Sequence, residues 1–168
     1  MNEDEKYIQR CIDLAYLGQG KVAPNPMVGC VIVKDGIIIG EGYHENFGGS
    51  HAEINAIRNV GNDAAIQGAT IFVSLEPCTH FGKTPPCTLA ILALKPKRVV
   101  IGSRDTNPSV AGKGIDRLKR EGIEVVEGIL EEECRALNKR FFTFHEKRRP
   151  YVILKWAQTK DGFLDRNR

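Results

Sequence analysis

The chain has no long apolar stretch and no segment of the kind that directs secretion. Residues 1–6 are acidic and polar, so a basic region followed by an apolar one is missing. No apolar run approaches the ~20 residues that a membrane-spanning helix needs. We therefore expect a soluble protein of the cytoplasm.

An excess of charge of one sign is lacking as well. The 168 residues include 24 basic and 21 acidic side chains, which leaves a net charge of +3, and no window is a run of one sign. Aromatic residues make up 7% of the chain. Proteins that bind nucleic acids or membranes usually carry basic surfaces, so we expect neither as a partner.

Cysteines are few, and their number is odd. Five cysteines in a reducing compartment disfavour a disulfide framework and favour thiolate ligands or buried thiols. Cys11, Cys30 and Cys134 lie on or near apolar stripes, so we expect buried thiols there. Cys78 directly follows Pro77, and Cys87 follows a pair of prolines.

Hydrophobic periodicity predicts one mixed α/β domain without internal repeats. Val28–Val33 and Ile37–Gly42 are β-rich runs separated by an Asp-Gly turn, which predicts an antiparallel hairpin. Strands and helices then alternate, which predicts parallel pairing through right-handed crossovers. The expected helices cover residues 4–18, 51–60, 86–94, 115–121 and 130–146, and the later strands cover 70–75, 98–102 and 123–126.

The last segment differs from the rest. Residues 147–150 form a charged link closed by a proline, Tyr151–Ala157 has a strand pattern, and a turn follows it. This strand has no later element to pair with, so we expect it to open a second domain that is cut off. The alternative is a C-terminal edge strand on the first sheet.

Four residues suggest a metal centre with an open position. One imidazole, His51, and two thiols, Cys78 and Cys87, can hold zinc through three protein ligands, which is typical of catalytic rather than structural sites. Glu53 can move protons beside the open position. A second interpretation uses His80 as a fourth ligand, which would close the site and make it structural.

The helical phase predicts where Glu53 points. In a helix that begins near His51, Glu53 shares the core-facing stripe with Ala56, Ile57 and Val60. A buried carboxylate needs a cation or a donor, and burial raises its pKa toward the range useful for a general acid or base. The alternative is an exposed first turn, where a glutamate favours the helix dipole.

The two cysteines lie where thiolates are stabilised. Pro85 and Pro86 precede Cys87 at the start of an apolar helical run, and proline suits the first turn of a helix. The unpaired amides there favour a thiolate. Cys78 comes just after the strand over residues 70–75, at a chain reversal.

The spacing of these residues resembles one family of zinc deaminases. Zinc nucleobase deaminases carry a His-x-Glu and a Pro-Cys-x-x-Cys motif, whereas here eight residues separate the two cysteines. The expanded segment 76–87 resembles the bifunctional pyrimidine deaminase/reductase of riboflavin biosynthesis, as do residues 23–29, 105–114 and 149–157. Two departures are Thr106, where proline is usual, and Lys160, where an apolar residue is usual.

This resemblance implies a fold and a reaction. The fold would be a cytidine-deaminase-like three-layer α/β/α sandwich with a mixed five-stranded sheet, with a deaminase domain over residues 1–146 and a linker with the first strand of a reductase domain over 147–168. The reaction would be hydrolytic deamination of 2,5-diamino-6-(5-phosphoribosylamino)pyrimidin-4(3H)-one to the aminouracil and ammonia. Zinc would be the cofactor, NADPH would be needed only with the reductase half, and a homo-oligomer is allowed.

The same resemblance suggests residues that bind substrate. Each also has a simpler explanation: Asn25, Asp105 and Asn107 suit turns, and a lone histidine or lysine usually packs or faces solvent. The candidates are Asn25, His44, His80, Lys83, Asp105 and Asn107.

Two other functions stay open. A relative acting on guanine or on a transfer-RNA adenosine would fit the His-x-Glu motif, although such enzymes use the short ligand loop and a basic or aromatic surface. A non-catalytic module stabilised by zinc would fit the ligands alone.

Overall fold

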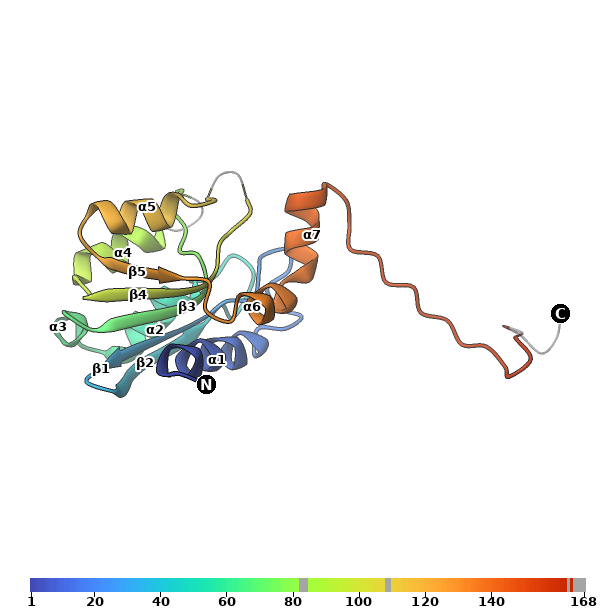
Figure 1. Ribbon diagram of the computed structural model, residues 1–168, viewed down its shortest axis with the longest axis horizontal. Coiled ribbons are helices and arrows are strands. Elements are labelled where there is room, and N and C mark those ends of the chain that lie inside the picture. The colour runs from blue at the N-terminus through green and yellow to red at the C-terminus, as the bar shows by residue number, and fades with distance from the viewer. Residues whose placement is uncertain (82–84, 108–109, 163, 165–168) are drawn as a thin grey trace.

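The sheet predicted from the sequence is present in the computed structural model, which describes residues 1–81, 85–107, 110–162 and 164 (Figure 1). Five strands lie in the order β2-β1-β3-β4-β5. β1 pairs antiparallel with both β2 and β3, whereas β3, β4 and β5 are parallel. The strands are β1 Gly29–Lys34, β2 Ile37–Tyr43, β3 Thr70–Leu75, β4 Arg98–Ser103 and β5 Glu124–Glu127.

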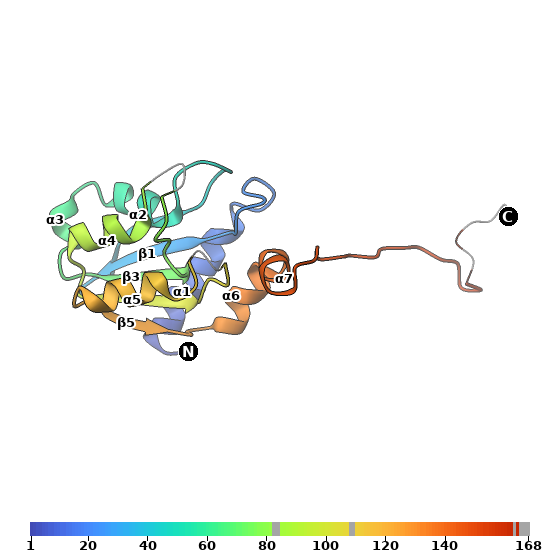
Figure 2. The ribbon, with the colours of Figure 1, turned by 90° about the horizontal axis from the view of Figure 1, so that it is seen from above.

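Helices cover both faces of this sheet and make three layers (Figure 2). One core holds side chains of α2, α3, α4 and α5 against one sheet face, and a second core holds α1 and Cys134 of α6 against the other. The three-layer α/β/α sandwich is therefore confirmed. The helices are α1 Glu3–Tyr16, α2 Ala52–Val60, α3 Asp63–Ile66, α4 Cys87–Leu94, α5 Lys113–Arg120, α6 Glu131–Leu137 and α7 Lys139–Lys147.

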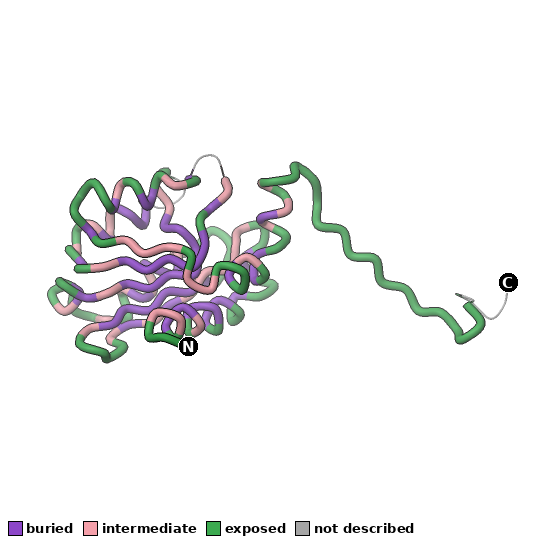
Figure 3. The backbone as a smooth tube through the Cα atoms, viewed as in Figure 1, coloured by how far each residue is buried: buried purple, intermediate pink, exposed green. Residues whose placement is uncertain are grey.

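Strand alternation divides the core between these two faces. Cys30 and Ile32 point to the α2 side of β1, while Val31 and Val33 point to the α1 side. The purple stretches of Figure 3 follow most of the length of β1, β3 and β4, because both faces of these strands are covered. Cys11, Cys30 and Cys134 are buried free thiols, as predicted.

Close backbone contact fixes α2 on the sheet. A Cβ atom at Gly42 in β2 would lie 2.3 Å from the amide nitrogen of Ala56 and 2.7 Å from the carbonyl oxygen of Ala52. Glycine is therefore required for this approach. The helix that follows His51 is held directly against β2, which positions the residues of its first turn.

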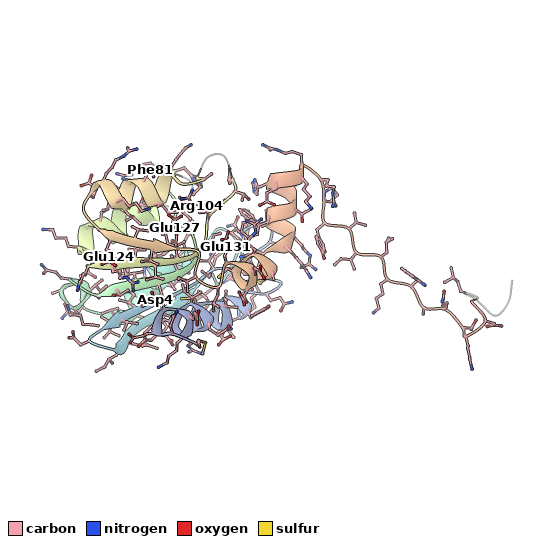
Figure 4. All side chains as sticks on the ribbon, viewed as in Figure 1. Asp4, Phe81, Arg104, Glu124, Glu127 and Glu131 are labelled. Carbon is pink, nitrogen blue, oxygen red and sulfur yellow. The ribbon has the colours of Figure 1, made fainter. Side chains whose placement is uncertain are left out.

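An ion pair fastens α1 to the sheet. Nη1 and Nη2 of Arg98, at the start of β4, each lie 2.7 Å from an oxygen of the Asp4 carboxylate. Arg98 also bonds Glu124 of β5 through Nε. Asp4 and Glu124 are labelled in Figure 4, near the sheet end where α1 begins.

One expected element is wrong, and one element was not expected. The helix predicted over 130–146 is two helices, because the chain breaks at Asn138, whose side chain bonds Met27. The short helix α3 was not predicted. Tyr151–Ala157 is exposed and extends from α7, and within the described part of the chain it has no pairing partner, so its assignment as the first strand of a further domain stays a prediction. None of the described helices combines the length and the apolar character needed to cross a bilayer.

Candidate active site

Three elements bring the expected metal ligands together. His51 is the N-cap residue of α2, Cys78 lies beyond the end of β3, and Cys87 is the first residue of α4. His51 Nδ1 lies 3.5 Å from Cys78 Sγ and 3.2 Å from Cys87 Sγ. All three donor atoms lie within 4.8 Å of one another. Among the described residues, His80 is not part of this group, so the four-ligand interpretation has no support.

The donor set fits zinc. Bond lengths of 2.0–2.1 Å to nitrogen and 2.3 Å to sulfur in a tetrahedral site place the nitrogen and sulfur atoms about 3.5 Å apart. The two observed nitrogen–sulfur distances are close to that value. Two soft thiolates and an imidazole are typical zinc ligands, and three of them leave one position open.

Hydrogen bonds make Cys78 the more acidic of the two thiols. A hydrogen bond from the Cys87 thiol, with further contributions from His51 and the Cys87 amide, lowers the pKa of Cys78 well below its usual value despite partial burial. The same thiol contact and burial raise the pKa of Cys87. The Cys87 amide donates to Cys78 Sγ over 3.3 Å. One thiolate is thus already stabilised by the chain itself.

Glu53 points inward, as the helical phase predicts. Its side chain is 3% exposed and lies in the first turn of α2, two residues after His51. Burial raises the pKa of this carboxyl group, opposed in part by His51. A carboxyl group whose pKa is raised holds a proton more readily, and a general acid/base must hold a proton between accepting it and returning it.

A cavity of about 890 Å³ opens beside these residues. It lies at one end of the sheet, where β3 and β4 end, β1 begins and β2 ends. Ligands of open α/β sheets bind at the carboxyl ends of parallel strands. Of the candidate residues, the cavity is lined by Asn25, His44, His51, Glu53, Cys78, His80, Asp105 and Asn107.

Asn25 and His44 are joined on one wall of the cavity. Nδ2 of Asn25 lies 3.1 Å from Nε2 of His44, and Nδ1 of His44 lies 3.0 Å from the carbonyl oxygen of Ser50. A carbonyl only accepts, so Nδ1 carries the proton and Nε2 accepts from Asn25. Burial lowers the pKa of His44. A neutral imidazole is therefore the form that this network stabilises.

The opposite wall carries the remaining candidates. Asp105 is buried, and its Oδ1 accepts a bond from the Asn107 amide over 2.7 Å. Desolvation raises the pKa of Asp105 to about 6. His80 is exposed at the cavity rim. Lys83 lies outside the described residues.

Two buried polar residues at the site were missed from the sequence. Glu76 was noted only as part of the motif before Cys78, yet its carboxylate accepts hydrogen bonds from four backbone amides. Asn138 falls inside the helix predicted over residues 130–146, but its side chain donates to the Met27 carbonyl over 2.7 Å and accepts from the Met27 amide over 2.8 Å. A charged residue directly after a buried strand was the one available signal for Glu76.

Comparison with known proteins agrees with this site. Residues 1–103 match the family described as the cytidine and deoxycytidylate deaminase zinc-binding region. The chain is 53% identical over 136 residues to a diaminohydroxyphosphoribosylamino-pyrimidine deaminase of Buchnera aphidicola, and the match covers 81% of this chain and 91% of that protein.

Longer relatives match over nearly the whole chain. The riboflavin biosynthesis protein RibD of Aquifex aeolicus is 52% identical over 161 residues, which are 96% of this chain and 45% of that protein. The crystal structure of a Thermotoga maritima diaminohydroxyphosphoribosylaminopyrimidine deaminase/5-amino-6-(5-phosphoribosylamino)uracil reductase has a TM-score of 0.88 at 52% identity, covering 94% of this chain and 45% of that one.

The chain thus spans less than half the length of these longer riboflavin biosynthesis proteins. The extent of the family match, the 53% identity to a protein of similar length and the grouped zinc ligands agree. The chain belongs to the cytidine and deoxycytidylate deaminase zinc-binding family, among the relatives of the riboflavin biosynthesis deaminases.

Proposed function

We propose that this chain hydrolytically deaminates 2,5-diamino-6-(5-phosphoribosylamino)pyrimidin-4(3H)-one. The observation that carries the proposal is the buried Glu53 carboxyl group, which lines the same cavity as His51 and Cys78, the two residues whose ligand atoms are grouped with that of Cys87. The substrate class is supported by the relative of similar length, whose name describes a deaminase of that kind of pyrimidine.

The chain's own groups would handle the protons. Zinc held by His51, Cys78 and Cys87 would supply a Lewis acid that makes a bound water molecule more acidic. Glu53 would carry the two protons of the attacking water in turn, the first to the ring nitrogen and the second to the departing amine. The carbon–nitrogen bond at ring C2 breaks, ammonia leaves and C2 becomes a carbonyl carbon.

The cavity walls would orient the ring. Asn25 already donates to neutral His44, so the remaining hydrogen-bonding atoms of its amide can face substrate. Asp105 and Asn107 offer an acceptor and an amide from the opposite wall. A volume of about 890 Å³ leaves room for a phosphoribosyl group beside the ring. We keep His80 and Lys83 as proposed contacts to that group.

A single comparison of substrates tests the proposal. Ammonia release is measured with the phosphoribosylated diaminopyrimidinone, with guanine and cytosine as free bases, and with transfer RNA. We expect release from the phosphoribosylated compound alone. Activity on RNA or on guanine alone would favour a different base deaminase, and a zinc-loaded protein without activity on any of these compounds would favour a non-catalytic module.

The organisation beyond this reaction is also proposed. Residues 1–146 form the deaminase domain, and residues 147–168 form a linker and the first strand of a reductase domain that uses NADPH. The extended segment over residues 151–157 and the greater length of the relatives support this division. We further propose a cytoplasmic enzyme that acts on a small molecule and can form a homo-oligomer.

A further inference from the structure

Glu76 holds two parts of the polypeptide together at the cavity. It lies between β3 and the candidate ligand Cys78, and its side chain is only 4% exposed. Oε2 accepts from the amides of Asp105 and Gly112, at 3.2 and 2.9 Å. Oε1 accepts from the amides of Gly114 and Ile115, at 2.9 and 3.3 Å. Glu76 is the one carboxylate in the described part of the chain that accepts from four backbone amides.

These four donors come from both sides of one connection. Asp105 lies just after β4, while Gly112 is the N-cap residue of α5 and Gly114 lies in its first turn. One oxygen, Oε2, therefore bonds both the start of the connection and its end. The carboxylate thereby joins the two ends of the connection, because each of its lone pairs accepts from a backbone amide. We call these four hydrogen bonds, from Asp105, Gly112, Gly114 and Ile115 to Glu76, the Glu76 clasp.

The start of α5 packs tightly against the segment that leads to Cys78. A Cβ atom at Gly114 would lie 2.3 Å from the carbonyl oxygen of Pro77 and 3.1 Å from Oε1 of Glu76. The first turn of α5 thus rests directly on the residue before Cys78. In addition, the Glu76 amide donates to the carbonyl oxygen of Ser103 over 2.9 Å. Main chain and side chain of Glu76 both tie the metal-ligand segment to the end of β4.

The connection carries two candidate substrate contacts, Asp105 and Asn107, both on the cavity wall. We propose that Glu76 is a positioning residue that sets the distance between this wall and the metal ligands, and so determines substrate affinity. This rests on the proposed deaminase function. A role confined to capping α5 would leave substrate binding unaffected, because α5 packs against the sheet through Ile115 and Leu118 in either case.

The main test is Glu76→Gln in the intact chain. The substitution keeps the size of the side chain but replaces one carboxylate oxygen by an NH₂ group. That group cannot accept hydrogen bonds, so it would oppose the two backbone N–H groups that the oxygen had bound. We expect KM for the phosphoribosylated diaminopyrimidinone to rise about tenfold or more, with kcat within about threefold and one zinc retained per chain. Glu76→Asp keeps the charge but shortens the reach, so its KM should lie between the two.

The matched control is Glu127→Gln. Glu127 of β5 accepts from the side chains of Arg104 and Lys119 close to the same connection, and Arg104 and Glu127 are labelled in Figure 4. Its bonds are to side chains at the surface, so KM should stay within twofold or so of the wild type. A folded, zinc-loaded Glu76→Gln with unchanged KM would overturn the proposal, and so would an equal rise in both variants.

A double-mutant cycle separates positioning from general damage. Asn107→Ala should raise KM in the wild-type background, and it should raise KM much less in the Glu76→Gln background if Glu76 acts through this wall. If the two substitutions raised KM independently, so that the factor for the double variant was the product of the two single factors, the proposal would be overturned.

Amide hydrogen exchange provides a test that needs no activity and no variant. In the wild-type protein, the amides of Asp105, Gly112, Gly114 and Ile115 should be protected. Free exchange of these four amides would overturn the clasp even if every variant failed to fold. Protected amides in a chain without deaminase activity would instead contradict the proposed function and leave the clasp intact.

Discussion

The backbone amide of Cys87 donates a hydrogen bond to Sγ of Cys78, 3.3 Å away, so the first residue of α4 stabilises charge on the other candidate ligand. The two thiols are therefore parts of one hydrogen-bonded unit and not independent side chains. Metal binding at this unit should be coupled to the position of α4, because α4 begins at one of the ligands.

Removal of zinc should lower thermal stability. When the free concentration of a ligand is about 1,000 times its Kd, binding to the folded state adds about 4 kcal/mol to the free energy of unfolding. For a chain of this size that gain raises the Tm by roughly 10 °C. We expect a chelator to lower the Tm by that order, as followed by differential scanning fluorimetry. Cys87→Ser should have a low Tm that the chelator no longer changes. An unaltered wild-type Tm after verified zinc loss would contradict this role.

Glu53→Gln should separate metal binding from catalysis. The amide keeps the size of the side chain but cannot shuttle protons, so ammonia release should fall by about 10² to 10⁴ with the zinc content unchanged. Metal analysis and a steady-state assay give both readouts. Glu45→Gln, at an exposed position, is the control and should keep full activity. Full activity of the Glu53 variant would refute its assignment as the acid/base.

Asp105 should make stability depend on pH in an unusual direction. Burial raises its folded-state pKa to about 6, above the ordinary value of 3.8. Between these values the folded state keeps a proton that the unfolded state has lost, so stability falls as the pH rises from about 4 to about 6. Denaturation of the wild type and of Asp105→Asn, with chelator at every pH, should show the variant gaining relative stability across this window. A constant difference would contradict the shift.

Removal of the Thr106 hydroxyl group should make the folded protein more stable. Its Oγ1 is buried and has no hydrogen-bond partner, the one such side-chain atom in the described part of the chain. Thr106→Val should stabilise the protein by about 1 kcal/mol, because no desolvated hydroxyl remains. Thr88→Val is the matched control, since the Thr88 hydroxyl donates to the Cys78 carbonyl over 3.1 Å. Thr88→Val should lower the free energy of unfolding by a similar amount, as measured by urea denaturation. If both variants changed the free energy of unfolding in the same direction, the explanation would be contradicted.

Asn138→Asp tests the bridge from the start of α7 to the segment that carries Asn25. The aspartate keeps the acceptor for the Met27 amide but turns an oxygen toward the Met27 carbonyl, in a nearly buried place. We expect a loss of about 2 kcal/mol or more in unfolding free energy. Asn59→Asp removes a comparable bond, to the Glu41 carbonyl, at an exposed position and should cost clearly less. Similar losses would show that burial is not decisive.

Local patterns predicted most of the elements of this fold. The strand over Thr70–Leu75 has the predicted bounds, and the hairpin turn lies at Asp35 and Gly36 as expected. Periodicity and turn chemistry depend on near neighbours, so they can be read along the chain. The break at Asn138 could not be predicted this way, because it depends on Met27, 111 residues away.

The site shows the same division. His51, Glu53, Cys78 and Cys87 were found because their residue types and spacing carry the chemistry. Glu76 was not found, since its partners are backbone amides, which look alike in any sequence. Hydrogen bonds to the main chain leave no pattern of residue types, and only the folded arrangement reveals them.

The ion pair between Asp4 and Arg98 has a consequence for how the chain folds during its synthesis on the ribosome. The two residues are 94 positions apart, so a ribosome working at about 5 to 20 residues per second delivers Arg98 about 5 to 20 s after Asp4. Throughout that interval the apolar stripe of α1, with Ile8 and Ile12, lacks the part of its cover that Val100 of β4 contributes. Part of this stripe should therefore stay exposed to water until β4 has been made and paired with β3.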